Sequence, residues 1–166
     1  MEDKFKNSLL TVCRLLDKHN VQYMLVGGTA VALNGYYRLS KTSAGELTEK
    51  PDIDIWYNPT YENYYKILKV LEELGWDIKG LKNDKSPDPR KSFIKLDFYN
   101  FTLDLLPNIK ASIKFLSAYK RKETVEFEET PIHYITYLDL VEDKKATARK
   151  KDLEDIEQLR KLNDED

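Results

Sequence analysis

The chain has 166 residues, 34% of them charged, and a net charge of −2 at pH 7. This balance excludes a protein that covers nucleic acid with one broad basic face, and leaves room only for a local basic cleft. The length predicts one domain over residues 1–166 with an apolar core of its own. Because the chain has one cysteine and no apolar run near the roughly 20 residues of a membrane span, we expect a cytoplasmic protein without an internal disulfide or membrane contact.

Apolar spacing predicts the elements of the first half of the chain. The expected elements are, in chain order, a helix over 5–19, a strand over 22–26, a helix over 28–35, a strand over 53–57 and a helix over 61–74. The polar segment 36–50 contains Gly45, which favours an extended hairpin or a loop between the second helix and the second strand. Gly75 is the expected C-terminal cap of the helix that precedes it.

The second half of the chain begins with a segment of loop composition, 79–90, in which glycine and prolines stand among charged residues. Thr136, followed by Asp139, is typical of the start of a helix. The remaining expected elements are strands over 92–99 and 101–106, a short helix over 109–119, strands over 124–128 and 132–135, a helix from 136 to 148 and a helix over 152–162. Together these elements predict an α+β fold, a mixed sheet with helices packed on it and a C-terminal helical segment.

Two aspartates lie two residues apart in the predicted strand, in the run Pro51-Asp52-Ile53-Asp54-Ile55-Trp56. Successive side chains of a strand point to opposite faces, so Asp52 and Asp54 project together. Two ionised carboxylates on one face repel each other unless a cation lies between them, and Mg²⁺ prefers hard oxygen ligands. Although such a pair alone is also typical of a solvated strand edge, the pattern predicts a divalent-metal site.

A glycine pair, Gly27-Gly28, lies between a predicted strand and a predicted helix and is followed by Thr29. Glycine lacks a Cβ, so the backbone N–H groups at such a turn can approach a phosphate closely. Alone, the pair is more typical of a tight turn. Its occurrence together with the aspartate pair favours a phosphate-binding turn that faces a metal site.

A third carboxylate stands in the later predicted strand 101–106, where Asp104 shares a face with Thr102 and Leu106. Asp97, one strand earlier, is the alternative candidate for this third position. The pattern alone does not decide between Asp104 and Asp97, because Asp104 also fits the turn at the end of a strand.

These motifs resemble the nucleotidyltransferase superfamily of the DNA polymerase β type: a glycine pair that opens a helix, an Asp-x-Asp strand and a later lone strand aspartate. The length resembles the minimal nucleotidyltransferases, some of which act in toxin–antitoxin systems. The stretch Lys145-Ala-Thr-Ala-Arg149-Lys-Lys151-Asp152-Leu-Glu-Asp155 is similar to the basic-acidic signature of the AbiEii-like toxin branch. The resemblance covers nearly the whole chain.

The resemblance implies a role for each matching residue. Asp52, Asp54 and Asp104 would be catalytic and would bind two Mg²⁺ ions, and Asp104 would also assist deprotonation of the attacking hydroxyl. The implied nucleotide-binding residues hold the triphosphate through backbone amides, a hydroxyl or positive charge, and are Gly27, Gly28, Thr29, Arg38, Lys145 and Lys151, with Arg149 beside the last two.

The chain departs from the superfamily pattern in one spacing. The superfamily usually places its Asp-x-Asp pair closer to the glycines, whereas 23 residues lie between Gly28 and Asp52 here. The excess, residues 37–50, includes Arg38 and is expected to loop out where it can contact nucleotide or acceptor. Asp152, near the other end of the chain, is equally suited to a functional role and to an N-cap of the last helix.

The resemblance implies a Mg²⁺-dependent enzyme that transfers a nucleoside monophosphate from a nucleoside triphosphate to an acceptor hydroxyl. The acceptor is left open between RNA, protein and a small molecule, and an antitoxin is the expected partner if the protein acts in a toxin–antitoxin system. The alternative is a non-catalytic nucleotide-binding or regulatory module that retains the fold.

Overall fold

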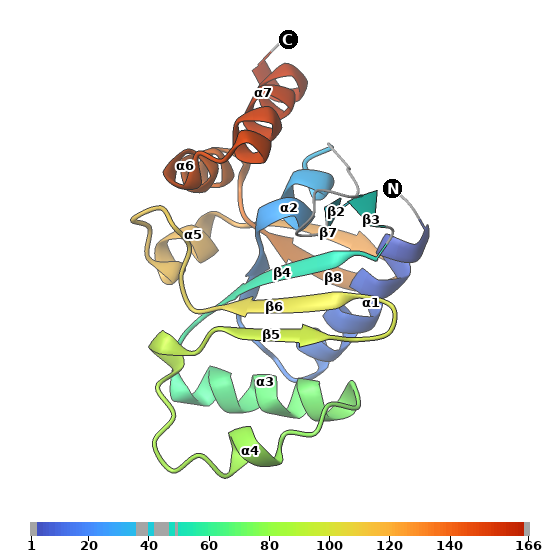
Figure 1. The fold of residues 1–166 in the computed structure, drawn as a ribbon, viewed down its shortest axis with the longest axis vertical. Helices are drawn as coiled ribbons and strands as arrows, with labels where there is room; N and C mark the ends of the chain where they lie inside the picture. Colours follow the sequence, from blue (N-terminus) through green and yellow to red (C-terminus); the bar gives the residue numbers. More distant parts are fainter. Residues whose placement is uncertain (1–2, 36–39, 42–46, 49, 165–166) are drawn as a thin grey trace.

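A six-stranded sheet with mixed strand directions organises the chain (Figure 1). The structure is a computed structural model that describes residues 3–35, 40–41, 47–48 and 50–164. The strands of the sheet, in spatial order, are β5 (Ile94–Asp97), β6 (Thr102–Leu106), β4 (Asp52–Tyr57), β1 (Tyr23–Leu25), β8 (Thr130–Tyr134) and β7 (Glu123–Phe127). The β4–β6 and β1–β8 pairs are parallel and the other pairs are antiparallel. A separate two-stranded pair joins β2 (Ser40–Lys41) to β3 (Leu47–Thr48).

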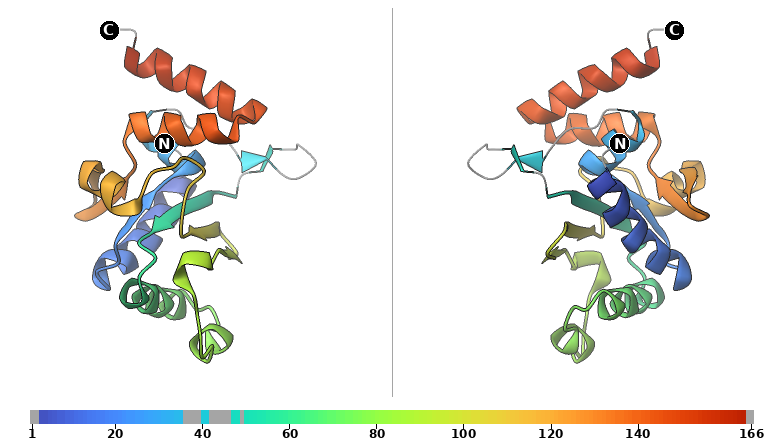
Figure 2. Two further views of the ribbon diagram at one scale, coloured as in Figure 1. Left: turned by 90° about the vertical axis from the view of Figure 1, so that its left-hand side faces the viewer. Right: turned by 90° about the vertical axis from the view of Figure 1, so that its right-hand side faces the viewer.

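Helices pack on both faces of this sheet and extend from its two ends. They are α1 (Asp3–Lys18), α2 (Gly27–Leu33), α3 (Tyr61–Glu73), α4 (Lys79–Lys82), α5 (Phe115–Arg121), α6 (Tyr137–Thr147) and α7 (Lys150–Asp164), with a 3₁₀ turn η1 (Pro89–Lys91). Figure 2 shows α6 and α7 stacked at one end of the molecule and α3 and α4 at the other. The expected mixed sheet with packed helices and a C-terminal helical segment is therefore confirmed.

The alternation of side chains along each strand divides the core into two clusters. Ile53 and Ile55 of β4 lie in the cluster to which α1 and α3 contribute their buried faces. Trp56 of the same strand points to the opposite cluster, where α2, α5, α6 and α7 contribute apolar side chains. This second face is only partly filled, because the beginning of β4 carries Asp52 and Asp54 on it instead of apolar residues.

Two sequence expectations differ from the observed fold. Within 79–90, which we expected to be a loop, α4 forms one turn and η1 begins. Elements this short contain less than two turns, so no apolar period marks them in the sequence. The helix expected over 109–119 begins only at Phe115, since the preceding backbone N–H groups of Lys110 and Ala111 donate to the Asp143 side chain instead.

The caps that the sequence indicates are present. The Thr136 side chain accepts from the Asp139 N–H at 3.2 Å at the start of α6, and Thr60 caps α3 in the same way. Gly75 follows the end of α3 with φ +92°, a conformation that favours glycine. Among the described residues, no helix is both long and apolar enough to span a membrane.

Candidate active site

The parallel pairing of β4 with β6 brings the predicted carboxylates together. Asp54 and Asp104 are direct register partners on these adjacent strands, and Asp52 is opposite Thr102, whose hydroxyl donates to the Asp52 carboxylate. All three carboxylates therefore occupy one face of the sheet. We call Asp52, Asp54 and Asp104 the acidic wall.

The acidic wall gathers three carboxylates with few hydrogen-bond donors around them. Oδ1 of Asp104 is buried and has no hydrogen-bond partner among the described residues. Burial and the negative charges of Asp104 and Asp52 raise the pKa of Asp54 from 3.8 to about 7. Burial also raises the pKa of Asp104, against the opposing charge of Lys95, its register partner on β5. The wall is thus arranged to attract a cation.

The glycine pair lies directly against this wall. Gly27 begins α2 with φ +56°, and a Cβ built on it would lie 2.7 Å from Oδ2 of Asp54. The Val26 N–H donates to the Asp54 carbonyl at 3.0 Å, which joins the start of α2 to β4. Glycine is required at position 27 both for the backbone conformation and for the close approach of the carboxylate.

Thr29 connects the same two elements from beneath. Its hydroxyl donates to the Asp52 carbonyl and accepts from the Asp54 N–H, both at 3.0 Å. The residue is 1% exposed, so its hydroxyl lies inside the protein and positions β4. The hydroxyl that the resemblance assigns to the triphosphate is thus bonded to the backbone of β4 in this structure.

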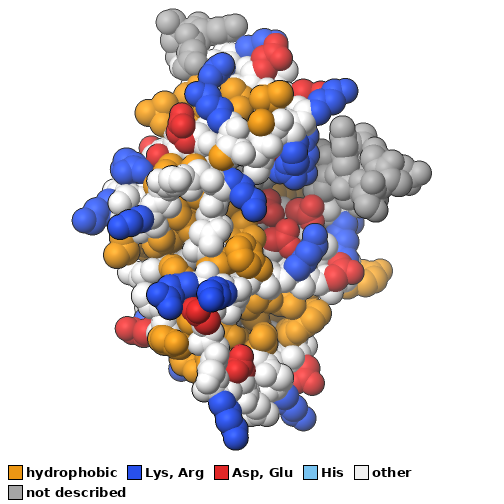
Figure 3. All heavy atoms as spheres, turned by 60° about the vertical axis from the view of Figure 1, so that its left-hand side comes forward, with side chains coloured by type: hydrophobic (Ala, Val, Ile, Leu, Met, Phe, Trp, Pro, Cys, Tyr) orange, Lys and Arg blue, Asp and Glu red, His pale blue; other side chains and the backbone are white. Residues whose placement is uncertain are grey.

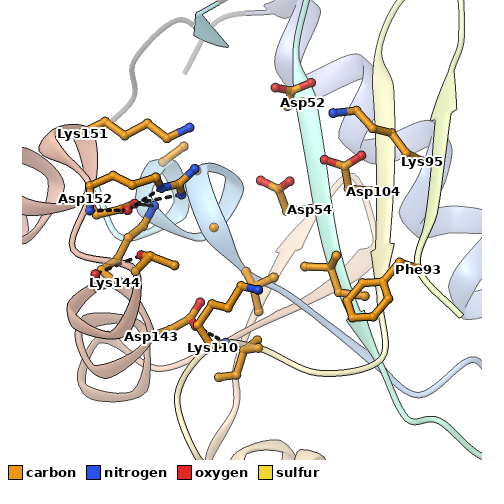
Figure 4. A pocket seen from close by; sticks show the side chains of 18 of the residues that line it. Asp52, Asp54, Phe93, Lys95, Asp104, Lys110, Asp143, Lys144, Lys151 and Asp152 are labelled. Atoms are coloured by element: carbon orange, nitrogen blue, oxygen red, sulfur yellow. Dashed lines mark hydrogen bonds and ion pairs between the residues drawn. The ribbon is translucent and has the colours of Figure 1, made fainter. Parts of the chain in front are cut away.

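Positive side chains from the α6–α7 junction also line the pocket, and we call Lys144, Arg149 and Lys151 the basic wall. Figure 4 shows Lys144 and Lys151 opposite the acidic wall. Lys144 is 4% exposed, and its Nζ lies 3.2 Å from Oδ1 of Asp152 and 3.2 Å from Oδ2 of Asp155. Arg149 Nε donates to Oδ2 of Asp152 at 2.7 Å. The two helices are therefore joined by a network of alternating charge, in which Lys144, Asp152 and Asp155 are buried and Arg149 is exposed.

Asp152 is the centre of this network. Its carboxylate also accepts from the Arg149 backbone N–H at 3.1 Å, just before the first residue of α7. That bond is the reach-back from the third residue of a helix to its N-cap, so Asp152 supports the cap without being the cap itself. Burial alone would raise the pKa of Asp152, but the Arg149 hydrogen bonds and the Lys144 charge hold it well below its usual range.

A loop between β6 and α5 forms the third side of the site. Oδ1 of Asp143, on α6, accepts from the N–H of Lys110 at 2.7 Å and of Ala111 at 3.3 Å. On the sheet side, Trp56 Nε1 donates to the Pro107 carbonyl at 3.3 Å. The loop is thus held from two directions, and Lys110 on it lines the site.

These three sides enclose a pocket of about 510 Å³. Figure 3 shows it as a recess in which acidic side chains gather, with lysine and arginine side chains around it. Its lining includes six basic and five acidic side chains, so neither sign of charge alone fills it. They are Lys50, Lys95, Lys110, Lys144, Arg149, Lys151, Asp52, Asp54, Asp104, Asp143 and Asp152.

The acidic wall fits a divalent cation that shares its ligands with a substrate. Within the described ranges, no group of three histidine, cysteine or acidic side chains converges as a ready-made metal cage. Mg²⁺ is commonly held by one or two carboxylates together with substrate phosphates and water, and carboxylate oxygens are its preferred protein ligands. The unpartnered Asp104 oxygen and the repulsion at Asp54 are what such an ion would relieve.

The structure brings together most of the residues that the motifs indicate. Gly27, Gly28, Lys151 and the acidic wall all line the pocket. Lys145 does not; it lies on the outer side of α6, 3.5 Å from Glu142. Asp97, the alternative third carboxylate, is 76% exposed, pairs with Lys50 and lies outside the pocket. Arg38 falls outside the described residues.

Sequence reasoning missed several lining residues. Lys144 is one position from the lysine that the resemblance implied, and a shift of one residue turns a helical side chain by about 100°. Lys95 could have been found, because an antiparallel pairing of the two predicted strands places it beside Asp104. Phe93 and Asp143 had no signal of their own in the sequence.

Comparison by sequence finds no relative: no protein-family model matches the chain, and no curated protein matches it. Solved structures do share its fold. A lincosamide antibiotic adenylyltransferase, LnuA, solved with lincomycin bound, is 18% identical with a TM-score of 0.62, over 95% of this chain and 97% of that one. The antibiotic-resistance factor ANT(2'')-Ia is 16% identical with a TM-score of 0.56, over 96% and 85%.

A further structure with this fold is an antigenic nucleotidyltransferase-like protein from Paracoccidioides brasiliensis. It is 14% identical with a TM-score of 0.55, over 97% of this chain and 77% of that one. At these identities the likeness concerns the arrangement of helices and strands. It agrees with the topology of the sheet that carries the acidic wall.

Proposed function

Since the chain has the fold of nucleotidyltransferases, we propose that it transfers a nucleoside monophosphate from a nucleoside triphosphate to an acceptor hydroxyl and releases pyrophosphate. One observation carries the proposal: carboxylates on adjacent strands, Asp54 and Asp104, face Lys144 and Arg149, which Asp152 holds in place, across a pocket that Gly27 and Gly28 line. The negative charge of a triphosphate must be balanced by cations, and three carboxylates line one side of this pocket with Lys95 beside them. That side is suited to hold metal ions between protein and substrate.

The acidic wall would hold Mg²⁺, which when bound neutralises phosphate charge and orients the reacting oxygens. Gly27 and Gly28 present their backbone to the same pocket. The basic wall stands opposite, where positive charge balances the β- and γ-phosphates. Because Lys144 and Arg149 are fixed by Asp152, they need little rearrangement to bind a phosphate.

Asp104 is the residue we assign to the proton transfer. Its buried Oδ1 has no hydrogen-bond partner in the described part of the chain, and burial raises its pKa, which makes the carboxylate a stronger base. The acceptor oxygen attacks the α-phosphorus, its proton passes to Asp104, and the bond from the α-phosphorus to the bridging oxygen breaks. Pyrophosphate then leaves towards the basic wall.

Transfer of label from α-³²P nucleoside triphosphates into a cell extract tests this proposal. With Mg²⁺, the wild-type protein should label acceptor material, and Asp54→Asn and Asp104→Asn should each reduce labelling at least a hundredfold. Asp97→Asn is the matched control, because it removes an aspartate of the same hairpin that lies outside the pocket. If Asp54→Asn or Asp104→Asn labelled acceptor material as strongly as the wild type does, the proposal would be contradicted.

Label transfer together with a nucleotide-binding measurement distinguishes the proposed enzyme from the alternative function. Mg²⁺-independent nucleotide binding without any transfer would favour a non-catalytic nucleotide-binding or regulatory module. The choice of acceptor among RNA, protein and small molecules rests on where the label appears. A role in a toxin–antitoxin system, with an antitoxin as partner, rests on the resemblance of residues 145–155 alone, and co-purification of a partner encoded nearby would test it.

A further inference from the structure

The two walls define a direction for the proposed reaction. In an in-line displacement the attacking and leaving oxygens lie on opposite sides of the phosphorus. If pyrophosphate leaves towards Lys144, Arg149 and Lys151, the acceptor must approach from the far side of the acidic wall. That far side is formed by β5 and β6, where Asp104 and Lys95 are register partners.

An aromatic side chain stands on this acceptor side. Phe93 lines the pocket, is 58% exposed and stands two residues before Lys95, the register partner of Asp104. Figure 4 shows its ring beyond Asp104, on the side away from Asp52. Leu106, two residues after Asp104 on the same face of β6, and the buried Ile109 continue an apolar surface from it. A phenylalanine has no polar atom to hydrate, so its face is available for an apolar or planar partner.

The backbone that carries Phe93 is held in place. The hydroxyl of the buried Tyr57, which has one proton to donate, lies within hydrogen-bond distance of the carbonyls of Ser92 and Pro89, the latter at 2.9 Å. The Ser92 hydroxyl donates to the Asp88 carbonyl at 2.7 Å. An exposed ring on an anchored backbone loses little entropy on binding and can act as a preformed platform.

We propose that Phe93 is the acceptor platform of the pocket: it stacks on a ring of the acceptor next to the hydroxyl that Asp104 deprotonates. The acceptor class is a hydroxyl compound whose reacting sugar or ring carries a flat or apolar face. A nucleotide at the end of an RNA and a glycosidic small molecule both have this chemistry. This inference rests on the proposed function, because it assigns the acceptor side of the same pocket.

Steady-state transfer from α-³²P ATP, with Mg²⁺, to three probes tests the platform: total cellular RNA, lincomycin and tobramycin. For whichever probe the wild type labels, Phe93→Ala should raise the acceptor KM about tenfold. The ATP KM should stay within about twofold, and Phe93→Trp should restore the acceptor KM because it keeps an aromatic face. Tyr99→Ala is the matched control, since Tyr99 is 96% exposed and lies outside the pocket.

Each other outcome overturns a defined part of the proposal. A rise in the ATP KM instead of the acceptor KM would assign Phe93 to the nucleobase. Unchanged kinetics would make Phe93 an idle surface residue. Labelling of the cell extract without labelling of any of the three probes would overturn the acceptor class alone, whereas an extract without label would overturn the proposed function itself.

Discussion

Both walls of the pocket contain aspartates, but the pKa values of these aspartates are shifted in opposite directions. In the acidic wall, Asp54 and Asp104 are register partners on adjacent strands, and burial raises the pKa of both. In the basic wall, Asp152 is completely buried but paired with Lys144 and Arg149, and its pKa lies below its usual range.

This difference distinguishes a carboxylate that stabilises the folded chain from carboxylates that we propose to bind a cation. Asp152 has its cations in the folded chain, so it stabilises the junction of α6 and α7 and positions the lysine and arginine beside it. Asp54 and Asp104 lie beside each other instead, and in the proposed function their cation is Mg²⁺. Groups whose environments push their pKa values apart are typical of active sites.

The largest effect should come from breaking the paired side. Asp152→Ala leaves the buried Lys144 with only Asp155 and removes the bonds to Arg149, so we expect unfolding free energy to fall by about 3–5 kcal/mol. Urea unfolding measures it, with Glu154→Ala, an exposed residue of the same helix, as the control. A loss below about 1 kcal/mol would mean that this network does not hold α7 in place.

A substitution at Gly27 should disturb the acidic wall. Gly27→Ala places a methyl group 2.7 Å from the Asp54 carboxylate on a backbone with φ +56°, so we expect about 2 kcal/mol of destabilisation. Because the carboxylate must move, label transfer should fall at least tenfold. Gly80→Ala is the control, as nothing lies within 4 Å of its Cβ position. Equal activity of both variants would show that the close approach at Gly27 is unimportant.

The smallest effect should be a gain in stability. Because the pKa of Asp54 is raised from 3.8 to about 7, the folded state holds a proton that the unfolded state has released between about pH 4 and pH 7. Stability of the metal-free protein should therefore fall as the pH rises through this window. Asp54→Asn cannot ionise and should therefore be more stable than wild type at pH 8 but not at pH 4.

Urea unfolding in EDTA at both pH values measures this gain, and Glu62→Gln, an 81% exposed carboxylate on α3, serves as the control. Identical pH dependence of wild type and Asp54→Asn would contradict the electrostatic description of the acidic wall. An increase in the stability of the wild-type protein when Mg²⁺ replaces EDTA at pH 8 would support this description.

Local rules predicted the acidic wall well. The two-residue period of a strand places Asp52 and Asp54 on one face, and the same rule places Asp104 with Thr102. The register that pairs Asp54 with Asp104 could not be predicted this way, because the alternation of side chains within one strand does not determine which residue of a distant strand lies opposite.

The basic wall was harder to predict, for reasons of helix geometry and burial. Lys144 and Lys145 are neighbours in sequence, but only the fold decides which of them faces the pocket. Thr29 is next to the glycines in sequence, yet its hydroxyl is used by the backbone of β4. Such contacts are made by partners far away in the chain, which a pattern of nearby residues does not contain.

The order of the two walls along the chain has a consequence for synthesis. The carboxylates of the acidic wall belong to residues 52–104, whereas the basic wall begins at Lys144 and depends on Asp152. A growing chain leaves the ribosome from its N-terminus, so the sheet can form while the cationic side of the pocket is still untranslated. The nascent protein would therefore lack one side of its proposed nucleotide site until α7 has emerged and docked.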